Sequence, residues 1–262
     1  MGITNIRYAT HTLNFWWGCR EKSDGCANCY ARQFSERLGR HCFGDGPRHI
    51  TKTPWHDVWR WDRAAGKTHA PEFIATRNVI LTMSMGDIFE RNPALDEPRA
   101  AAFEILSKLE YSTILLLTKR PENILEMVPA AWLDEWPKHI MPGVTVENQK
   151  AASDRIPELL RVPAHDYWLS VEPLLENINF GGLGLGRINW VVVGGESGGD
   201  PRECNPAWIR HVVNQCVAHW VFVWVKQMGG PGAPREAVED LPVDLQKYRR
   251  SPWLFSPESE TI

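Results

Sequence analysis

At 262 residues, with 29 lysines and arginines against 32 aspartates and glutamates, the chain carries a formal charge of -3, which excludes the strongly basic composition typical of non-specific nucleic-acid binders. Six cysteines are too few for a disulfide scaffold in a chain of this length. The N-terminus lacks a basic leader with an apolar core, and no apolar run approaches the roughly 20 residues of a spanning helix, so we expect a soluble, cytoplasmic protein with no membrane partner.

The N-terminal part predicts a strand, a cysteine loop and a helix. Residues 12–18 mix β-formers and aromatics and predict a short strand. The loop that follows, 19–30, reads CREKSDGCANCY and spaces three cysteines as C-x6-C-x2-C. Tyr30, Phe34 and Leu38 then stand at i, i+4 and i+8, which predicts one face of a helix.

Residues 40–77 are rich in Pro, Gly, His and Trp and show no sustained period. They predict a long irregular insertion with room for one short helix. A structureless stretch of this length is usually functional, so we expect a lid or a substrate wall. The chain has 13 tryptophans, for which packing is the commoner role and stacking on a planar substrate the rarer one.

From residue 78 onward, strands and helices alternate. Apolar, β-branched runs predict six strands covered on both faces, at 78–84, 112–118, 140–146, 166–172, 188–194 and 220–226. Helices are expected at 94–110, 121–128 with 130–136, 148–160 and 206–219, whereas the connection 173–187 has no helical pattern.

This alternation predicts an α/β fold with a parallel sheet and right-handed crossovers. With the strand before Cys19 there are about six to seven parallel strands, which suits an open, partial βα barrel better than a closed eight-stranded one. We expect a single barrel domain over 1–228 and a C-terminal extension, 229–262, that packs on it.

Polar residues follow each predicted strand, where parallel βα folds bind their ligands. Turns and helix caps account for some of them, but not for a charged group after each of six runs. We therefore expect a binding mouth that the cysteine loop also faces. Its candidate residues are Ser84, Gly86, Asp87, Lys119, Thr145, Glu147, Ser170, Glu172, Gly195 and Glu196.

The cysteine loop favours an iron–sulfur cluster. Three thiolates, from Cys19, Cys26 and Cys29, can hold three irons of a 4Fe-4S cluster and leave the fourth iron open to a small chelating ligand. Structural zinc is the main alternative, with His41 or Cys42 as the fourth ligand. A redox pair in the C-x2-C segment is a third possibility.

A three-cysteine loop after the first strand of a partial βα barrel, followed at once by a helix, resembles the radical S-adenosylmethionine superfamily, whose usual spacing is C-x3-C-x2-C. The CANCY ending resembles the CxxCY of members such as spore photoproduct lyase. The segments WWGC, CANCYA, GDIFE, LTKRPEN, GVTVENQ, SVEPLL, GGESG and VKQMGG, in order between residues 15 and 230, are similar to a phage and prophage-borne three-cysteine family of unassigned function.

The superfamily resemblance implies a 4Fe-4S cluster on the three cysteines, with the amino and carboxylate groups of S-adenosylmethionine on the open iron. GDIFE would supply the contacts to the methionine amino group, and the later strand ends would hold the ribose and the carboxylate, with GGESG near the adenine. Implied cofactor contacts are Tyr30, Ser84, Gly86, Asp87, Lys119, Thr145, Glu147, Ser170, Glu172, Gly195 and Glu196.

The same resemblance implies an enzyme that generates a 5'-deoxyadenosyl radical with electrons from a flavodoxin or ferredoxin type donor. A nucleic-acid base or nucleotide is the first expectation for its substrate. Two other functions fit the residues: a zinc-stabilised module that binds nucleic acid or protein without catalysis, and a metal-independent hydrolase that uses carboxylates such as Asp87, Glu147 and Glu172.

Overall fold

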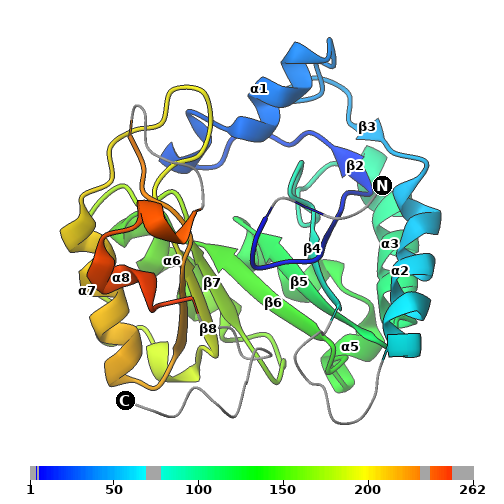
Figure 1. The fold of residues 1–262 in the computed structure, drawn as a ribbon. Coiled ribbons are helices and arrows are strands. Elements are labelled where there is room, and N and C mark those ends of the chain that lie inside the picture. Colours follow the sequence, from blue (N-terminus) through cyan, green and yellow to red (C-terminus); the bar gives the residue numbers. More distant parts are fainter. Residues whose placement is uncertain (1–3, 5, 69–77, 231–236, 250–262) are drawn as a thin grey trace.

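Seven parallel strands form one curled sheet, which is the frame of the molecule (Figure 1). The computed structural model describes residues 4, 6–68, 78–230 and 237–249. In spatial order the strands are β1 (His11–Leu13), β4 (Asn78–Thr82), β5 (Ser112–Thr118), β6 (Ile140–Thr145), β7 (Trp168–Val171), β8 (Trp190–Val193) and β9 (Phe222–Val225). Because β1 and β9 are the two edges of this sheet, the barrel is partial and open, as predicted from the strand–helix alternation.

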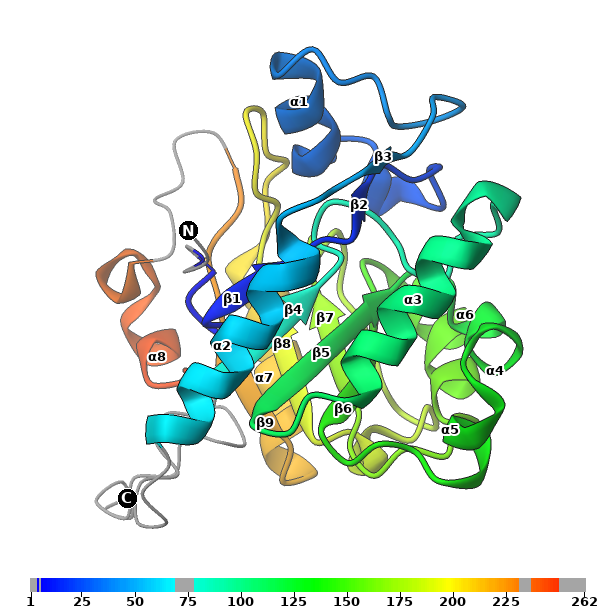
Figure 2. The same ribbon diagram turned by 90° about the vertical axis from the view of Figure 1, so that its right-hand side faces the viewer.

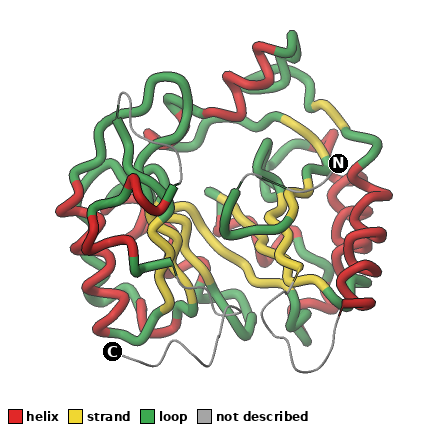
Figure 3. The backbone as a smooth tube through the Cα atoms, in the orientation of Figure 1, coloured by secondary structure: helices red, strands yellow, loops and turns green. Residues whose placement is uncertain are grey.

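Helices cover the outer face of the sheet (Figures 2 and 3). Figure 2 shows α2 and α3 side by side over β4 and β5, whereas α1 stands apart beyond the strand ends. The α-helices are α1 (Tyr30–Arg37), α2 (Pro54–Thr68), α3 (Asp96–Ser107), α4 (Ile124–Met127), α5 (Ala130–Asp134), α6 (Gln149–Leu159), α7 (Pro206–Ala218) and α8 (Val243–Gln246). None of the helices that the structure describes is both long and apolar enough to cross a membrane.

The strands bury side chains on both faces, because successive residues point to opposite sides of a strand. The larger apolar cluster fills the space between the sheet and its helices. A smaller cluster fills the inner face, where Tyr8 packs on Trp168 and Trp190 with ring centroids 6.4 and 5.5 Å away. Gly143 leaves room for one of these rings, since a Cβ there would lie 2.3 Å from Nε1 of Trp168. The aromatic floor makes the inner face solid below the strand ends.

The predicted irregular insertion at 40–77 is wrong in its middle part, where the helix is longer than the short one expected. Residues 54–68 form the fifteen-residue helix α2, and the part at 69–77 lies outside the described residues. Val58, Trp61 and Ala65 are buried at spacings of three and four, so this face packs against the sheet. The tryptophans of α2 therefore serve the core, and only residues 40–53 remain near the strand ends.

The predicted strand at 12–18 is divided in two. β1 ends at Leu13, and β2 (Trp16–Trp17) leaves the barrel to pair antiparallel with β3 (His49–Ile50). This small ribbon carries the chain from the barrel to the cysteine loop. At the other end of the chain, Leu245 is buried and the backbone of β9 bonds to Tyr248, so the described part of the predicted extension packs on the barrel.

Candidate functional site

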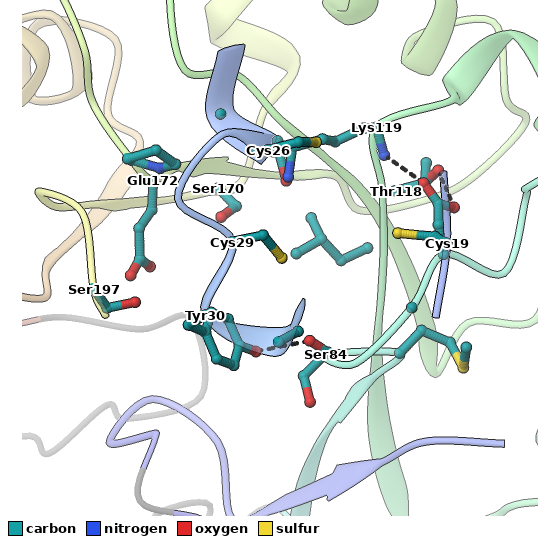
Figure 4. Close-up of a pocket in the computed structure, with 18 of the residues that line it drawn as sticks. Cys19, Cys26, Cys29, Tyr30, Ser84, Thr118, Lys119, Ser170, Glu172 and Ser197 are labelled. Carbon is teal, nitrogen blue, oxygen red and sulfur yellow. Dashed lines mark hydrogen bonds between the residues drawn. The ribbon is translucent and has the colours of Figure 1, made fainter. Parts of the chain in front are cut away.

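A cavity of about 340 Å³ lies at the carboxyl ends of the strands (Figure 4). The cysteine loop forms one wall, and Tyr8, Leu81 and Leu117 contribute apolar surface from the inner face of the sheet. Phe43 also lines it, so the segment before α2 does contribute to its wall. The cavity thus lies at the position where parallel βα folds bind ligands.

Most of the residues predicted for this mouth line the cavity. They are Cys19, Cys26, Cys29, Tyr30, Ser84, Gly86, Asp87, Lys119, Thr145, Ser170, Glu172 and Glu196. Glu147 and Gly195 are not among the lining residues. Glu147 is fully buried behind the cysteine loop, and Gly195 allows two loops to cross, since a Cβ there would lie 2.1 Å from the backbone nitrogen of Gly229.

The three thiols of the loop are free and share this cavity. Figure 4 shows the sulfur atoms of Cys19 and Cys29 directed toward the space between them. Burial raises the pKa of the Cys19 thiol well above its usual range, and the nearby Asp87 and Cys29 raise it further. Without a cation, Cys19 therefore stays protonated, and binding a metal would release its proton.

Glycines set the path of the chain into Cys19. Gly18 has a φ of +100° and bridges to Gly86 after β4, and a Cβ at Gly18 would lie 1.9 Å from the carbonyl oxygen of Cys42. A side chain at this position would be strained and would clash with backbone. This close approach brings Cys19 to the end of β4.

Buried ion pairs hold the first part of the cysteine loop. The amide of Arg20 donates to Glu90 (2.9 Å), which also pairs with Arg48 at 2.6 Å. The carbonyl of Arg20 accepts from Arg120 (2.7 Å), whose guanidinium pairs with Asp87 at 2.9 Å. The residue after Cys19 is thus fixed on both sides of its peptide unit.

Glu147 and Arg155 hold the middle of the loop. They pair at 2.8 Å, and Arg155 also donates to the hydroxyl of Ser23 (2.8 Å). Burial raises the pKa of the Glu147 carboxyl, but the Arg155 charge and the Ser23 hydrogen bond outweigh it, and the pKa lies below its usual value. Gly25 packs directly on this carboxylate, since a Cβ there would be 3.1 Å from Cδ of Glu147.

Glu196 holds the segment between the last two cysteines. Its carboxylate accepts from the side chain of Asn28 (3.0 Å) and forms an ion pair with Arg202 at 2.5 Å. Arg202 in turn donates to the carbonyl of Asp24 (3.2 Å). Burial opposes ionisation of Glu196, but the Arg202 and Asn28 hydrogen bonds lower its pKa overall. Glu196 is therefore a support of the loop as well as a lining residue.

The carboxylates of the mouth all have cationic partners. Asp87 accepts hydrogen bonds from Phe89 N, Thr118 Oγ1, Lys119 N and Arg120 NH1. Glu172 pairs with Lys226 at 2.5 Å. With Glu147 on Arg155, the three carboxylates proposed for a hydrolase are each neutralised in place, which favours a structural role over acid–base work.

A second group of polar residues faces the cavity without such partners. The Lys119 ammonium and the hydroxyls of Thr145 and Ser170 make no direct hydrogen bond with any residue that the structure describes. Ser197 lies at the edge of the same space (Figure 4). These groups are available to a ligand.

Tyr30 stands between this cavity and a larger groove, because it lines both. Its hydroxyl donates to the carbonyl of Ser84 (2.7 Å). Burial raises the pKa of Tyr30 to about 12, so the phenol is neutral near pH 7 and remains a donor. Tyr30 therefore marks the boundary between the cavity and the groove, with its hydroxyl bonded to the loop after β4.

The fourth ligand suggested for zinc does not reach the cavity. The thiol of Cys42 lies 3.1 Å from the hydroxyl of Ser35, buried under α1, and His41 is exposed. Within the described ranges, no group of three or more His, Cys, Asp or Glu side chains is arranged to hold a single metal ion.

The residues that sequence reasoning missed are mainly the partners of the loop: Glu90, Arg155, Arg202 and Asn28. Arg155 lies on α6, and it meets Ser23 across 132 positions of the chain. No spacing in the sequence predicts such a contact. Asn28 sits inside the cysteine motif, but its role depends on Glu196, 168 positions away.

A family model described as a protein of unknown function (DUF5131) matches residues 3–244. The chain belongs to this family. The match spans the whole barrel, with the cysteine loop and all the strand ends. No curated protein and no solved structure matches the chain, and the family description assigns no activity.

Proposed function

We propose that this protein is a radical S-adenosylmethionine enzyme in which Cys19, Cys26 and Cys29 hold a 4Fe-4S cluster. One observation carries the proposal: three free thiols line a single cavity at the carboxyl ends of an open parallel barrel. The loop that bears them is held by buried ion pairs. A cofactor bound there would be held by a loop that the fold fixes at several points.

The donor set suits such a cluster better than zinc. Among the described residues that line the cavity there is no histidine and no fourth cysteine. Three thiolates with one iron open to a chelating ligand match this set, whereas structural zinc has four closed protein ligands. Bound together, the cluster and S-adenosylmethionine would supply one-electron cleavage chemistry, the source of the 5'-deoxyadenosyl radical.

Residues of the cavity would bind and orient the methionine and ribose parts of S-adenosylmethionine. The Lys119 ammonium carries a positive charge at the cavity wall and can pair with a carboxylate. The hydroxyls of Thr145 and Ser170 can donate to or accept from ribose hydroxyls. The apolar floor at Leu81 and Leu117 would keep water away from the reacting atoms.

Metal analysis of anaerobically purified protein tests the proposal. We expect about four irons and four sulfides per chain, a brown colour that dithionite bleaches, and 5'-deoxyadenosine formed from S-adenosylmethionine. The triple variant Cys19→Ala, Cys26→Ala, Cys29→Ala should lose the iron. Cys216→Ala, which removes a buried thiol of α7 outside the cavity, is the matched control and should keep it.

Two results would overturn this function. Stoichiometric zinc without iron would assign the cysteines to a structural site. A full iron content with no 5'-deoxyadenosine, in the presence of dithionite and S-adenosylmethionine, would retain the cluster and reject the radical chemistry. The substrate is proposed to be a nucleic-acid base or nucleotide. The groove beside the cavity narrows this substrate class further.

A further inference from the structure

A groove of about 2040 Å³ runs along the open side of the barrel and adjoins the cavity. It touches both sheet edges, at His11 of β1 and Trp224 of β9, and α1 forms one wall with Phe34 and Arg37. Tyr30, Ser84 and Ser197 line the groove and the cavity alike. A ligand lying in the groove would therefore reach the cavity mouth at Tyr30.

Two arginines and two aromatic rings form a row along α1 and the strand before the cysteine loop. Arg37 lies over the ring of Phe34 (5.8 Å from Cζ to the centroid), Phe34 is 5.8 Å from Trp17, and Arg40 lies over Trp17 at 4.6 Å. Phe34 and Arg37 line the groove, and Trp17 and Arg40 continue the row. Phe34 is 41% exposed, although it belongs to an apolar helix face.

The two arginines of this row differ from the other cationic side chains of the same region in their partners. Arg20, Lys22, Arg32 and Arg48 each pair with a carboxylate. Within the described residues, Arg37 and Arg40 have no carboxylate partner and meet only aromatic rings. A guanidinium that lies over a ring, with no carboxylate beside it, keeps donors that an anion can use.

On the opposite side of the groove, Arg249 lies over Trp224 with its Cζ 5.6 Å from the ring centroid. Trp224 is buried, however, and Arg249 donates to the backbone carbonyls of Lys226 and Ala237. This pair therefore packs within the wall, and the exposed ring and the cations without carboxylate partners lie on the α1 side. Exposed rings that stack on bases, combined with cations that follow a phosphate backbone, are the features by which single strands are bound. A duplex would hide the base faces from these rings.

We propose that this groove binds a single-stranded nucleic acid and delivers one of its bases to the cavity at Tyr30. The strand would lie on the Phe34 and Trp17 side of α1, with its phosphates near Arg37 and Arg40. Only the reaction of the delivered base rests on the proposed function. Binding of the strand itself requires neither the cluster nor S-adenosylmethionine. The net charge of -3 gives no general attraction to nucleic acid, so binding would depend on this local row of cations and rings.

Fluorescence anisotropy with labelled oligothymidylate and oligouridylate of about twelve nucleotides tests the groove directly, and the two probes distinguish DNA from RNA. The double variant Arg37→Ala, Arg40→Ala should bind the preferred strand at least about ten-fold more weakly and with a smaller dependence on salt. Phe34→Ala should weaken binding without changing the salt dependence.

Two further variants separate the groove from general effects of charge or folding. Arg187 also lies over a ring, Tyr167, at 5.8 Å, but it precedes β8 at the opposite end of the barrel, so Arg187→Ala should bind like the wild type. Glu36 lines the groove as an anion, and Glu36→Gln should tighten binding about two-fold to three-fold, a gain that misfolding cannot produce.

Equal binding by the wild type and the double variant would overturn the inference, as would a wild type that prefers a duplex of the same sequence. The proposed function is read out separately. Formation of 5'-deoxyadenosine without oligonucleotide should be unchanged in the double variant. If the protein holds zinc and still binds the single strand, the proposed enzymatic function is rejected and the proposed binding groove is retained.

Discussion

The polar residues at the strand ends fall into two groups that share a sequence position and differ in what they touch. Asp87, Glu147 and Glu196 are held in ion pairs that fix the cysteine loop. Lys119, Thr145 and Ser170 line the cavity, and they hydrogen-bond to other described residues through their backbone and not through their side chains. The first group supports the loop, and the second group is available to contact a ligand.

This difference assigns separate energetic roles to neighbouring residues. A buried ion pair is costly to break, because the remaining charge is left without a partner in a medium of low polarity. A polar group that faces a cavity is hydrated when no ligand is bound, and its loss costs the folded chain little. Changes in the first group should therefore lower stability, and changes in the second should lower only affinity.

Glu147→Gln should have the largest effect. It leaves the Arg155 guanidinium buried, at 7% exposure, without its carboxylate, and we expect a loss of about 3–5 kcal/mol in the free energy of unfolding. Urea denaturation of the metal-free protein measures it. The control is Glu158→Gln, which breaks an exposed pair with Arg161 and should cost less than about 1 kcal/mol. Similar costs for the two variants would contradict the supporting role of Glu147.

Acid should produce the same effect gradually. The pKa of Glu147 is lowered in the folded state, so its contribution to stability is complete above the ordinary value of 4.5 and is lost as the pH falls through the lower folded value. The difference in melting temperature between the wild type and Glu147→Gln should be constant above the ordinary pKa of 4.5 and shrink below it. A difference that persists unchanged to pH 3 or so would show that the carboxylate charge is not what holds the loop.

The barrel follows from the sequence because continuous apolar runs with helical patterns between them leave few alternatives to a parallel sheet. The position of the strand ends around one mouth follows from the same alternation. The helix α2 could not be predicted in the same way. Its buried face at Val58, Trp61 and Ala65 is interrupted by polar residues, and a Pro- and Gly-rich segment flanks it. Its boundaries depend on packing against β4 and β5, which no local pattern contains.

The sequence also could not predict which strand-end residues support the loop and which line the cavity. Glu147 and Thr145 are two positions apart on β6 and the turn after it, yet one lies behind the cysteine loop and the other lines the cavity. What separates them is the arrival of Arg155 and Ser23 from other segments. Spacing identified the set of polar residues, and only tertiary contacts could sort its members.

Lys119 is the sharpest test of the second group, because its effect should appear in affinity alone. Lys119→Met keeps the length of the side chain and removes the charge, so S-adenosylmethionine should bind about ten-fold more weakly, which corresponds to about 1.4 kcal/mol. The free energy of unfolding should stay within about 0.5 kcal/mol of the wild type. Titration calorimetry on the iron-loaded protein measures the first quantity and urea denaturation the second.

Lys108→Met is the matched control for Lys119, since that lysine pairs with Glu104 on the surface of α3 and should change neither quantity by more than a small amount. A Lys119 variant that binds S-adenosylmethionine normally would remove this ammonium from the ligand contacts. One that unfolds as readily as Glu147→Gln would place Lys119 among the supports. Because Lys119 is close enough to Glu147 to lower the pKa of that carboxyl, the paired measurement decides whether its charge serves the ligand or the loop.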